Sequence, residues 1–226
     1  MKLAIGMPVL DHMPGVAFPH HMATVVEAYK GWSTDNDKLE LITPIGSVPH
    51  DRARLIIAEE AIKRECTRLF FMDDDTLTPR GGIAKLMQTM TDRKAAIVTG
   101  FYLRRGYPYN TIWTNEMQDK TFLIDADQGV HQITSGGLGC CLVDLEWCCK
   151  NVPKPWFKMD QDESATVISD DVAFYRAVRK AEGLILGDAD VQCAHVGRPE
   201  FICRGTATSL RRYADDLASL SKQERQ

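Results

Sequence analysis

Short apolar runs alternate with segments of helical periodicity over residues 1–103, and this alternation constrains the fold more than any other feature. Four runs are predicted to be strands: KLAIGMPVL (2–10), LELITPI (39–45), RLFFM (68–72) and AAIVTGFYL (95–103). Three segments between them are predicted to be helices: 20–31, 51–66 and 79–92. Such alternation is typical of βαβ units, which build a parallel sheet with helices on both faces. We therefore expect an α/β fold with a mainly parallel central sheet.

The pattern changes in the second half of the chain. Between residues 107 and 134 there are short strand-like pieces with no helix between them, which predicts a smaller antiparallel part. The segments that follow are predicted to be a Gly-rich turn with a short strand and a helix (134–148), a polar loop (150–168), a helix bounded by Ser169 and Gly183 (169–183) and a strand (184–197). No internal repeat or Pro/Ser linker divides the sequence, so we expect a single domain over residues 1–226.

Composition and charge exclude several classes of protein. The 226 residues are 44% hydrophobic, which is enough for a full core, and the net charge of −4 provides no general attraction to nucleic acid or anionic lipid. The seven cysteines are odd in number, include no C-x-x-C pair and contain adjacent pairs that are poorly placed for disulfides, which together favour a reducing, cytoplasmic location. The N-terminal apolar run is too short for a signal peptide, and no stretch approaches the roughly 20 apolar residues of a membrane span.

Three consecutive carboxylates, Asp73, Asp74 and Asp75, follow the apolar run RLFFM. Adjacent carboxylates repel one another and resist leaving water, so a strand end of this kind needs a positive partner. In parallel sheets, ligands bind beyond the carboxyl ends of the strands, and carboxylate oxygens bind divalent cations. These features predict a metal site. The alternative is a solvated loop in which the acids cap the following helix.

Four motifs follow one another along the chain. HDRARLIIAEEAIKRECTRLFFMDDD (50–75) combines a helix with early arginines, an apolar strand and a D-x-D sequence. SGGLG (135–139), the acidic pair in SDDVAFYRAV (169–178) and the lone histidine in AHVG (194–197) come after it. This ordered set, over residues 3–197, resembles the inverting, family-2-like branch of glycosyltransferases with the GT-A fold.

The resemblance implies a GT-A type, Rossmann-like sandwich that moves a sugar from a nucleoside-diphosphate-sugar to an acceptor hydroxyl, with inversion of the anomeric centre. It implies a nucleotide-sugar-binding half (1–103) and an acceptor and catalytic half (104–200). Beyond the residues that carry the resemblance, the amphipathic pattern predicts a C-terminal helical tail (201–226). The apolar stripe of that tail is expected to pack on the domain or, alternatively, to form a homodimer contact. The resemblance does not specify the acceptor, which can be a glycan, a protein, a small molecule or a modified nucleic-acid base.

By the same resemblance, Asp73 and Asp75 hold the first and last positions of the D-x-D motif. Asp75 is then the direct ligand of Mn²⁺ or Mg²⁺, and Asp73 lies near the metal or the ribose. His195 matches the distal histidine that completes the coordination, and a histidine among oxygen ligands suits Mn²⁺ better than Mg²⁺. The metal neutralises the diphosphate as it leaves. The alternative for His195 is a core histidine with satisfied hydrogen bonds.

Asp170 and Asp171 open a predicted helix directly after Ser169. The structural interpretation is that acids in the first turn complement the helix dipole. The same position keeps a carboxylate ionised, as a general base requires. The resemblance implies that Asp171 takes the proton from the acceptor hydroxyl and that Asp170 orients it; the reverse assignment stays open.

The remaining candidates surround the donor and the acceptor. The candidate donor-binding residues are Pro8, Asp11, Arg52, Arg54, Asp73, Asp74, Arg104, Gly136 and Gly137. Arginine suits phosphate and glycine lets backbone approach a sugar, whereas solvated arginines and a plain turn are the alternatives. Trp156 and Phe157, in the polar loop, are the candidate acceptor platform, because aromatic rings stack on sugars and bases. Alternatively, they anchor the loop to the core.

Three other classes of protein remain as alternatives. A haloacid-dehalogenase-like phosphohydrolase also uses D-x-D at a strand end, but its motif follows the first strand and has Thr or Val where this chain has Leu77. A nucleotidyltransferase usually carries a Gly-rich basic signature after the first strand, which MPVLDHMPG (7–15) lacks. A non-catalytic nucleotide- or carbohydrate-binding module is disfavoured by the presence of all the acids and of His195.

Overall fold

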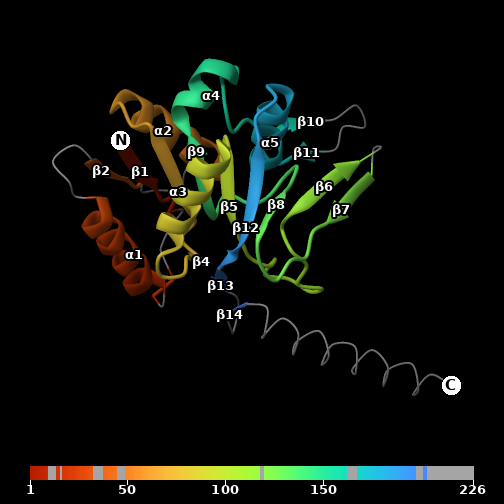
Figure 1. Ribbon diagram of the computed structural model, residues 1–226, viewed down its shortest axis with the longest axis horizontal. Helices are drawn as coiled ribbons and strands as arrows, with labels where there is room; N and C mark the ends of the chain where they lie inside the picture. Colours follow the sequence, from red (N-terminus) through yellow and green to blue (C-terminus); the bar gives the residue numbers. More distant parts are fainter. Residues whose placement is uncertain are drawn as a thin grey trace.

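The computed structural model describes residues 1–9, 14–15, 17–32, 38–44, 49–117, 120–161, 167–196 and 201–202 (Figure 1). The first half contains β1 (Lys2–Gly6), α1 (Ala17–Trp32), β2 (Lys38–Ile42), α2 (His50–Lys63), β3 (Arg68–Met72), β4 (Thr76–Leu77), α3 (Gly82–Arg93) and β5 (Ile97–Phe101). The second half contains β6 (Thr114–Met117), β7 (Lys120–Leu123), β8 (Val130–Gln132), β9 (Cys140–Asp144), α4 (Leu145–Asn151), β10 (Asp160–Gln161), β11 (Val167–Ile168), α5 (Asp170–Lys180), β12 (Ile185–Gln192), β13 (Ala194–Val196) and β14 (Phe201–Ile202).

The strands and helices expected in the first half are confirmed, although three strands are shorter than predicted. β3 covers the predicted residues, whereas β1 ends at Gly6, β2 at Ile42 and β5 at Phe101. Pro8 has no N–H to donate to a neighbouring strand, which agrees with the early end of β1. Between residues 107 and 134, where short strand-like pieces are expected, the structure has β6, β7 and β8, with β6 later in the sequence than the piece TIWT (111–114) that predicted a strand there. The predicted polar loop contains β10 and β11.

The central sheet has the strand order β2-β1-β3-β9-β5-β12-β8. In this sheet β2, β1, β3, β5 and β12 run in one direction, and β9 and β8 run antiparallel to their neighbours. The expected α/β fold with a mainly parallel sheet is therefore confirmed for the described part of the chain. β9 comes from the second half of the sequence but lies between β3 and β5, so both halves contribute to one sheet.

Helices cover both faces of this sheet, as expected (Figure 1). α2, α4 and α5 pack on one face, where Ile57 and Phe174 join Phe71 of β3 in an apolar cluster. α1 and α3 pack on the opposite face, where Leu86 joins Phe70 of β3 in a second cluster. Successive side chains of a strand point to opposite faces, so β3 is apolar from Leu69 to Met72 because both of its faces are buried there.

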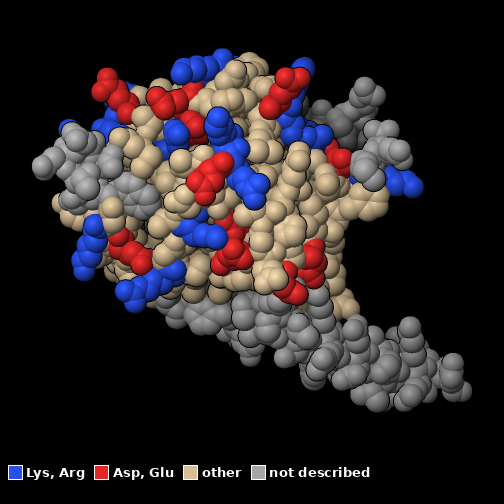
Figure 2. Space-filling view, viewed as in Figure 1, with Lys and Arg blue, Asp and Glu red and all other residues tan. Residues whose placement is uncertain are grey.

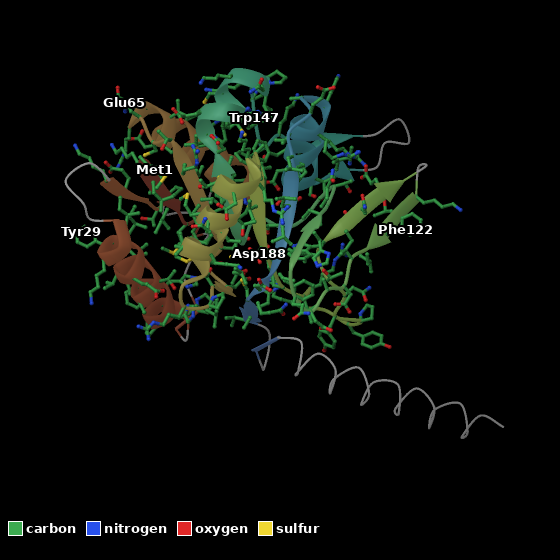
Figure 3. The ribbon with its side chains drawn as sticks, viewed as in Figure 1. Met1, Tyr29, Glu65, Phe122, Trp147 and Asp188 are labelled. Carbon is green, nitrogen blue, oxygen red and sulfur yellow. The ribbon has the colours of Figure 1, made fainter. Side chains whose placement is uncertain are left out.

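The smaller antiparallel part is also confirmed. β6 pairs with β7, and β14, β13 and β4 form a three-stranded sheet. The β6–β7 hairpin lies at the right of Figure 3, where the exposed Phe122 lies away from the central sheet. Trp113, directly before β6, is fully buried, and its indole N–H donates to the carbonyl of Gly100 at 3.2 Å. This side chain anchors the hairpin to the core.

The aromatic pair of the polar loop lies in the core. Trp156 and Phe157 are each 3% exposed. The Phe157 ring centroid lies 5.2 Å from that of Phe71 and 4.4 Å from that of Phe174, and the Trp156 indole donates to the carbonyl of Val152 at 3.2 Å. Burial of two large rings stabilises this loop conformation, so the rings anchor the loop and present no platform to an acceptor.

The six described cysteines, Cys66, Cys140, Cys141, Cys148, Cys149 and Cys193, are free thiols. Cys149 is exposed and the others are buried. Burial raises the pKa of Cys141 to about 12, so this thiol is neutral at physiological pH. The buried thiols therefore serve as small apolar side chains of the core.

On the face shown in Figure 2, the described acidic and basic side chains are interspersed. Within the described residues, no helix combines the length and the apolar character needed to cross a bilayer.

Two expectations fall on residues outside the described part of the chain. One is the donor contact of Asp11. The other is the apolar stripe of the tail, formed by Leu210, Tyr213, Leu217 and Leu220, and with it the homodimer contact. Both stay predictions.

Candidate active site

The three carboxylates lie on a tight turn between β3 and β4. The N–H of Asp73 donates to the carbonyl of Gly139 at 3.0 Å, and the N–H of Thr76 donates to the carbonyl of Asp73 at 3.1 Å. His21 of α1 is fully buried, and its Nε2 donates to the same Asp73 carbonyl at 3.0 Å. Burial lowers the pKa of His21, which keeps the ring neutral at physiological pH. The turn is thus held both from the segment before β9 and from α1.

Arg54, near the start of α2, bridges two acidic residues. Its Nη2 lies 3.1 and 3.0 Å from the carboxylate oxygens of Asp73, and its Nη1 lies 2.9 Å from Oδ2 of Asp170. Burial acts to lower the pKa of Arg54, but the charges of Asp73 and Asp170 outweigh it and raise that pKa above its ordinary value. Arg54 is one of the donor-binding residues predicted from the sequence; in the structure both of its Nη atoms are engaged by protein carboxylates.

The two acids that open α5 have different partners. Asp170 is buried and forms the ion pair with Arg54. Asp171 is half-buried, and its Oδ1 accepts hydrogen bonds from the N–H of Val172 at 2.7 Å and from the hydroxyl of Ser169. Asp170 is therefore committed to a charged partner, whereas the hydrogen bonds to Asp171 come from neutral groups. This difference favours Asp171 over Asp170 as a proton acceptor.

Pairing of β4 with β13 brings His195 to the carboxylate turn. His195 lies opposite Thr76 in this pairing, and the N–H of Val196 donates to the carbonyl of Asp75 at 2.7 Å. Nδ1 of His195 lies 2.9 Å from the carbonyl oxygen of Leu103, which can only accept, so Nδ1 carries the hydrogen. In the neutral ring, Nε2 then presents its lone pair toward Oδ1 of Asp75 at 3.3 Å.

Asp75 and His195 fit part of a divalent metal site. A metal-binding histidine commonly donates its other N–H to a carbonyl, as His195 does with Leu103. Asp73, predicted as a third ligand, is turned toward Arg54 instead, because the buried guanidinium needs its charge. In the part of the chain that the structure describes, no three acidic, histidine or cysteine side chains are grouped to hold a metal ion. The predicted set Asp73, Asp75 and His195 is therefore not assembled by the protein alone.

A loop after β5 carries two arginines to the cavity. It is closed by the N–H of Arg104, which donates to the carbonyl of Asn110 at 2.8 Å. Arg104 and Arg105 both line the cavity, and Nη1 of Arg105 lies 2.6 Å from Oδ2 of Asp75. Only Arg104 is among the donor-binding residues predicted from the sequence. The signal for Arg105 was its place beside Arg104 in YLRRGYPYN, which does not tell which of two adjacent side chains reaches an acid.

The Gly-rich segment packs directly against Tyr102. A Cβ atom on Gly137 would lie 2.1 Å from the Tyr102 hydroxyl, and one on Gly139 would lie 2.5 Å from Oγ1 of Thr76. The N–H of Gly139 donates to the Tyr102 hydroxyl at 2.8 Å. Burial raises the pKa of Tyr102 well above its ordinary value, so the hydroxyl stays protonated. Close packing therefore requires glycine at position 137, which also lines the cavity together with Gly136.

Replacing Gly137 with Ala is expected to lower the free energy of unfolding by about 1–3 kcal/mol, because the added methyl group overpacks the contact with Tyr102. Gly31→Ala in α1 is the matched control. Nothing lies within 4 Å of a Cβ at Gly31, and alanine favours a helix, so stability should stay or rise by at most about 1 kcal/mol. Urea unfolding measures both variants, and equal stability of the two would contradict the close packing.

These segments surround one cavity of about 1230 Å³. The residues predicted from the sequence that line it are Arg54, Asp73, Asp74, Asp75, Arg104, Gly136, Gly137, Asp170, Asp171 and His195. The fold thus brings the carboxylate turn, the Gly-rich segment, the start of α5 and the β13 histidine to one place. A single ligand can contact all four.

A further wall of the cavity comes from the β6–β7 hairpin and was not predicted. Its polar residues, with one from α5, are Thr114, Glu116, Thr121 and Arg176. Glu116 accepts a hydrogen bond from Arg179 at 2.7 Å, and this bond lowers the pKa of Glu116 and keeps it ionised. Arg176 follows Val172 by four residues, so both lie on the same face of α5, and both line the cavity. This helical spacing could have identified Arg176. The hairpin residues carry no such local signal.

Some predicted residues lie away from the cavity. Pro8 is buried after β1, and Arg52 is exposed on α2. Neither lines the cavity, nor do the core residues Trp156 and Phe157. For Arg52 the solvated helix-face interpretation is the one that agrees with its exposure.

Comparison with known proteins identifies the fold and not a family. No family model and no curated protein match the sequence. Among solved structures, A197 from STIV is similar over 90% of this chain and 94% of its own, with 13% identity and a TM-score of 0.61. GalNAc-T7, in a crystal structure with UDP, GalNAc and Mn²⁺, is similar over 86% of this chain and 43% of its own, with 7% identity and a TM-score of 0.50. The expected fold is thereby confirmed: the chain has a fold like that of a GT-A glycosyltransferase.

Proposed function

We propose that this protein is a metal-dependent glycosyltransferase that moves a sugar from a nucleoside-diphosphate-sugar to an acceptor hydroxyl. One observation carries the proposal: a single cavity, in a glycosyltransferase-like fold, is lined both by the Asp75–His195 pair and by Asp171. Transfer in one displacement needs a group that holds the leaving diphosphate and a carboxylate that accepts a proton. The fold neighbour GalNAc-T7, whose structure contains UDP and Mn²⁺, supports the same class of ligand.

Asp75 and His195 would hold Mn²⁺ or Mg²⁺, with further ligands from the donor's diphosphate and from water. When bound, the metal neutralises the charge that develops on the leaving diphosphate. Arg104 lines the same cavity, and its permanent positive charge suits phosphate. Gly136 and Gly137 expose backbone to the cavity, where a donor sugar can approach closely.

Asp171 acts as the general base of the transfer. Its carboxylate takes the proton of the acceptor hydroxyl while that oxygen bonds to the anomeric carbon. The bond between the anomeric carbon and the diphosphate oxygen breaks, and its electron pair leaves with the diphosphate. Attack from the side opposite the leaving group inverts the anomeric centre. Arg54 positions both ends of the site, because it holds Asp73 beside the donor and Asp170 beside the base.

A thermal-shift panel of UDP-, GDP- and dTDP-sugars with Mn²⁺, Mg²⁺ or EDTA tests the proposal. We expect one nucleotide with Mn²⁺ to raise Tm by about 5–10 °C, since a ligand at 100 times its Kd stabilises the fold by about 2.7 kcal/mol. In Asp75→Asn the Mn²⁺-dependent part of this shift should disappear. Slow hydrolysis of the donor can be measured in the same samples.

Asp92→Asn, at an exposed position on α3, is the matched control and should keep the full shift. If no nucleotide gives a metal-dependent shift, the glycosyltransferase proposal is wrong. The phosphohydrolase and the non-catalytic module would then be the better interpretations. Release of inorganic phosphate from a phosphomonoester would identify the former.

A further inference from the structure

Arg105 forms an ion pair with Asp75, whose carboxylate is a proposed ligand of the metal. Its Nη1 lies 2.6 Å from Oδ2 of Asp75, while Oδ1 of Asp75 faces Nε2 of His195 at 3.3 Å. The Asp75 side chain is 14% exposed, whereas that of Arg105 is 58% exposed. The ion pair therefore joins a well-buried anion to a cation that is largely in solvent and free to turn about its side-chain bonds.

A divalent cation beside Asp75 and a guanidinium at the same carboxylate repel each other, because both are positive and close. A metal ion that binds alone must therefore displace Arg105 into water. A metal ion that binds with a nucleoside diphosphate brings negative oxygens into the cavity that Arg105 lines. A guanidinium forms strong, charge-assisted hydrogen bonds with phosphate, so the displaced side chain then gains a new anion.

We propose that Arg105 exchanges one anion for another: it pairs with Asp75 in the absence of ligand and with the donor's diphosphate when metal and donor are bound. This proposal rests on the proposed function and adds a residue and a binding order to it. The exchange makes the metal and the nucleotide bind cooperatively, since each binds more tightly when the other is present. It also places a positive charge on the leaving diphosphate that metal ligation alone does not supply.

Arg104 provides the matched comparison. It carries the same charge, is the adjacent residue on the same loop and lines the same cavity, but the ion pair with Asp75 belongs to Arg105. Loss of either arginine removes one positive charge from the cavity. Of the two, only loss of Arg105 removes the ion pair that Arg105 makes with Asp75. The difference between the two variants therefore separates the effect of the Arg105–Asp75 ion pair from the effect of one fewer positive charge in the cavity.

The experiment measures two affinities by titration calorimetry in the full chain. The first is for Mn²⁺ alone, where Arg105→Gln should bind about two- to fivefold more tightly than wild type and Arg104→Gln should change less, as for loss of a partly exposed ion pair. The second is for UDP and GDP in saturating Mn²⁺, where Arg105→Gln should bind about tenfold more weakly. Arg105→Lys, which keeps the charge, should fall between wild type and Arg105→Gln in both measurements.

Under the exchange, Arg105→Gln strengthens Mn²⁺ binding and weakens nucleotide binding. Damage to the site would instead weaken both affinities. If wild type binds no nucleoside diphosphate with Mn²⁺, the proposed function is wrong and the exchange with it. If wild type binds one but Arg105→Gln holds Mn²⁺ no more tightly than Arg104→Gln does, or keeps the nucleotide affinity of wild type, the exchange is overturned and the function stands. Equal nucleotide affinity of wild type in EDTA and in Mn²⁺ also overturns it, because the metal and the nucleotide would then bind independently of each other.

Discussion

Replacing Asp171 with Asn is expected to lower the turnover of donor about a thousandfold, because a general base typically contributes 10²- to 10⁴-fold. Asparagine has nearly the same shape as aspartate and keeps an oxygen that accepts the N–H of Val172, so the start of α5 should stay folded. Its amide cannot take a proton from the attacking hydroxyl. The loss should therefore appear in kcat, and nucleotide affinity in Mn²⁺ should change by less than about twofold.

Hydrolysis of the donor can measure this effect before the acceptor is known, since water then takes the place of the acceptor hydroxyl. Asp170→Asn is the informative comparison, because Asp170 is adjacent in sequence but paired with Arg54. We expect it to disturb nucleotide affinity and stability through Arg54 and to reduce turnover less than Asp171→Asn does. A larger loss of turnover in Asp170→Asn would reverse the assignment of the base.

Replacing Arg54 with Met should lower the free energy of unfolding by about 3–5 kcal/mol, which is the usual cost of breaking a buried ion pair by removing one partner. Arg54 is 7% exposed and pairs with both Asp73 and Asp170. Methionine fills much of the same volume, so the loss reports the buried carboxylate of Asp170 and the half-buried carboxylate of Asp73 left without the guanidinium. The measurement is the midpoint of urea unfolding at unchanged m-value.

Two further variants serve as controls for this prediction. Arg52→Met removes the same side chain from an exposed position of α2 and should change stability by less than about 0.5 kcal/mol. The double variant Arg54→Met with Asp170→Asn removes one of the two unpaired carboxylates and should recover part of the loss. A cost for Arg54→Met that is no larger than that for Arg52→Met would show that the ion pairs do not hold the two segments together.

Much of the architecture can be predicted from the sequence, because the spacing of apolar residues along a short segment indicates which faces of a strand or helix are buried. RLFFM is apolar at the four positions after Arg68 since both faces of β3 are covered there. The order of strands and helices through β5 apart from the short β4, the change to antiparallel pieces afterwards and the start of α5 after Ser169 all follow from such local signals. The clustering of carboxylates after β3 likewise predicts a site at the end of that strand.

The partners of those carboxylates could not be predicted in the same way. Adjacent residues such as Arg104 and Arg105 carry equal local signals, and only the conformation of the loop decides which guanidinium meets Asp75. Arg54 looks like a phosphate ligand on a helix face, but the position of α5 turns it into a bridge between two acids. Trp156 and Phe157 lie in a polar stretch of sequence, yet both are buried. Phe157 packs between Phe71 of β3 and Phe174 of α5.

The sequence by itself determined the class of fold and the types of side chain available to the site, because propensity, periodicity and charge are properties of neighbouring residues. The tertiary structure decided which of those side chains meet. β9 enters the sheet between β3 and β5 and brings the Gly-rich segment to the carboxylate turn, and β13 pairs with β4 and brings His195 to Asp75. These pairings join segments far apart in the chain. Their stability depends on apolar area buried jointly by all the layers, which no single segment of the sequence encodes.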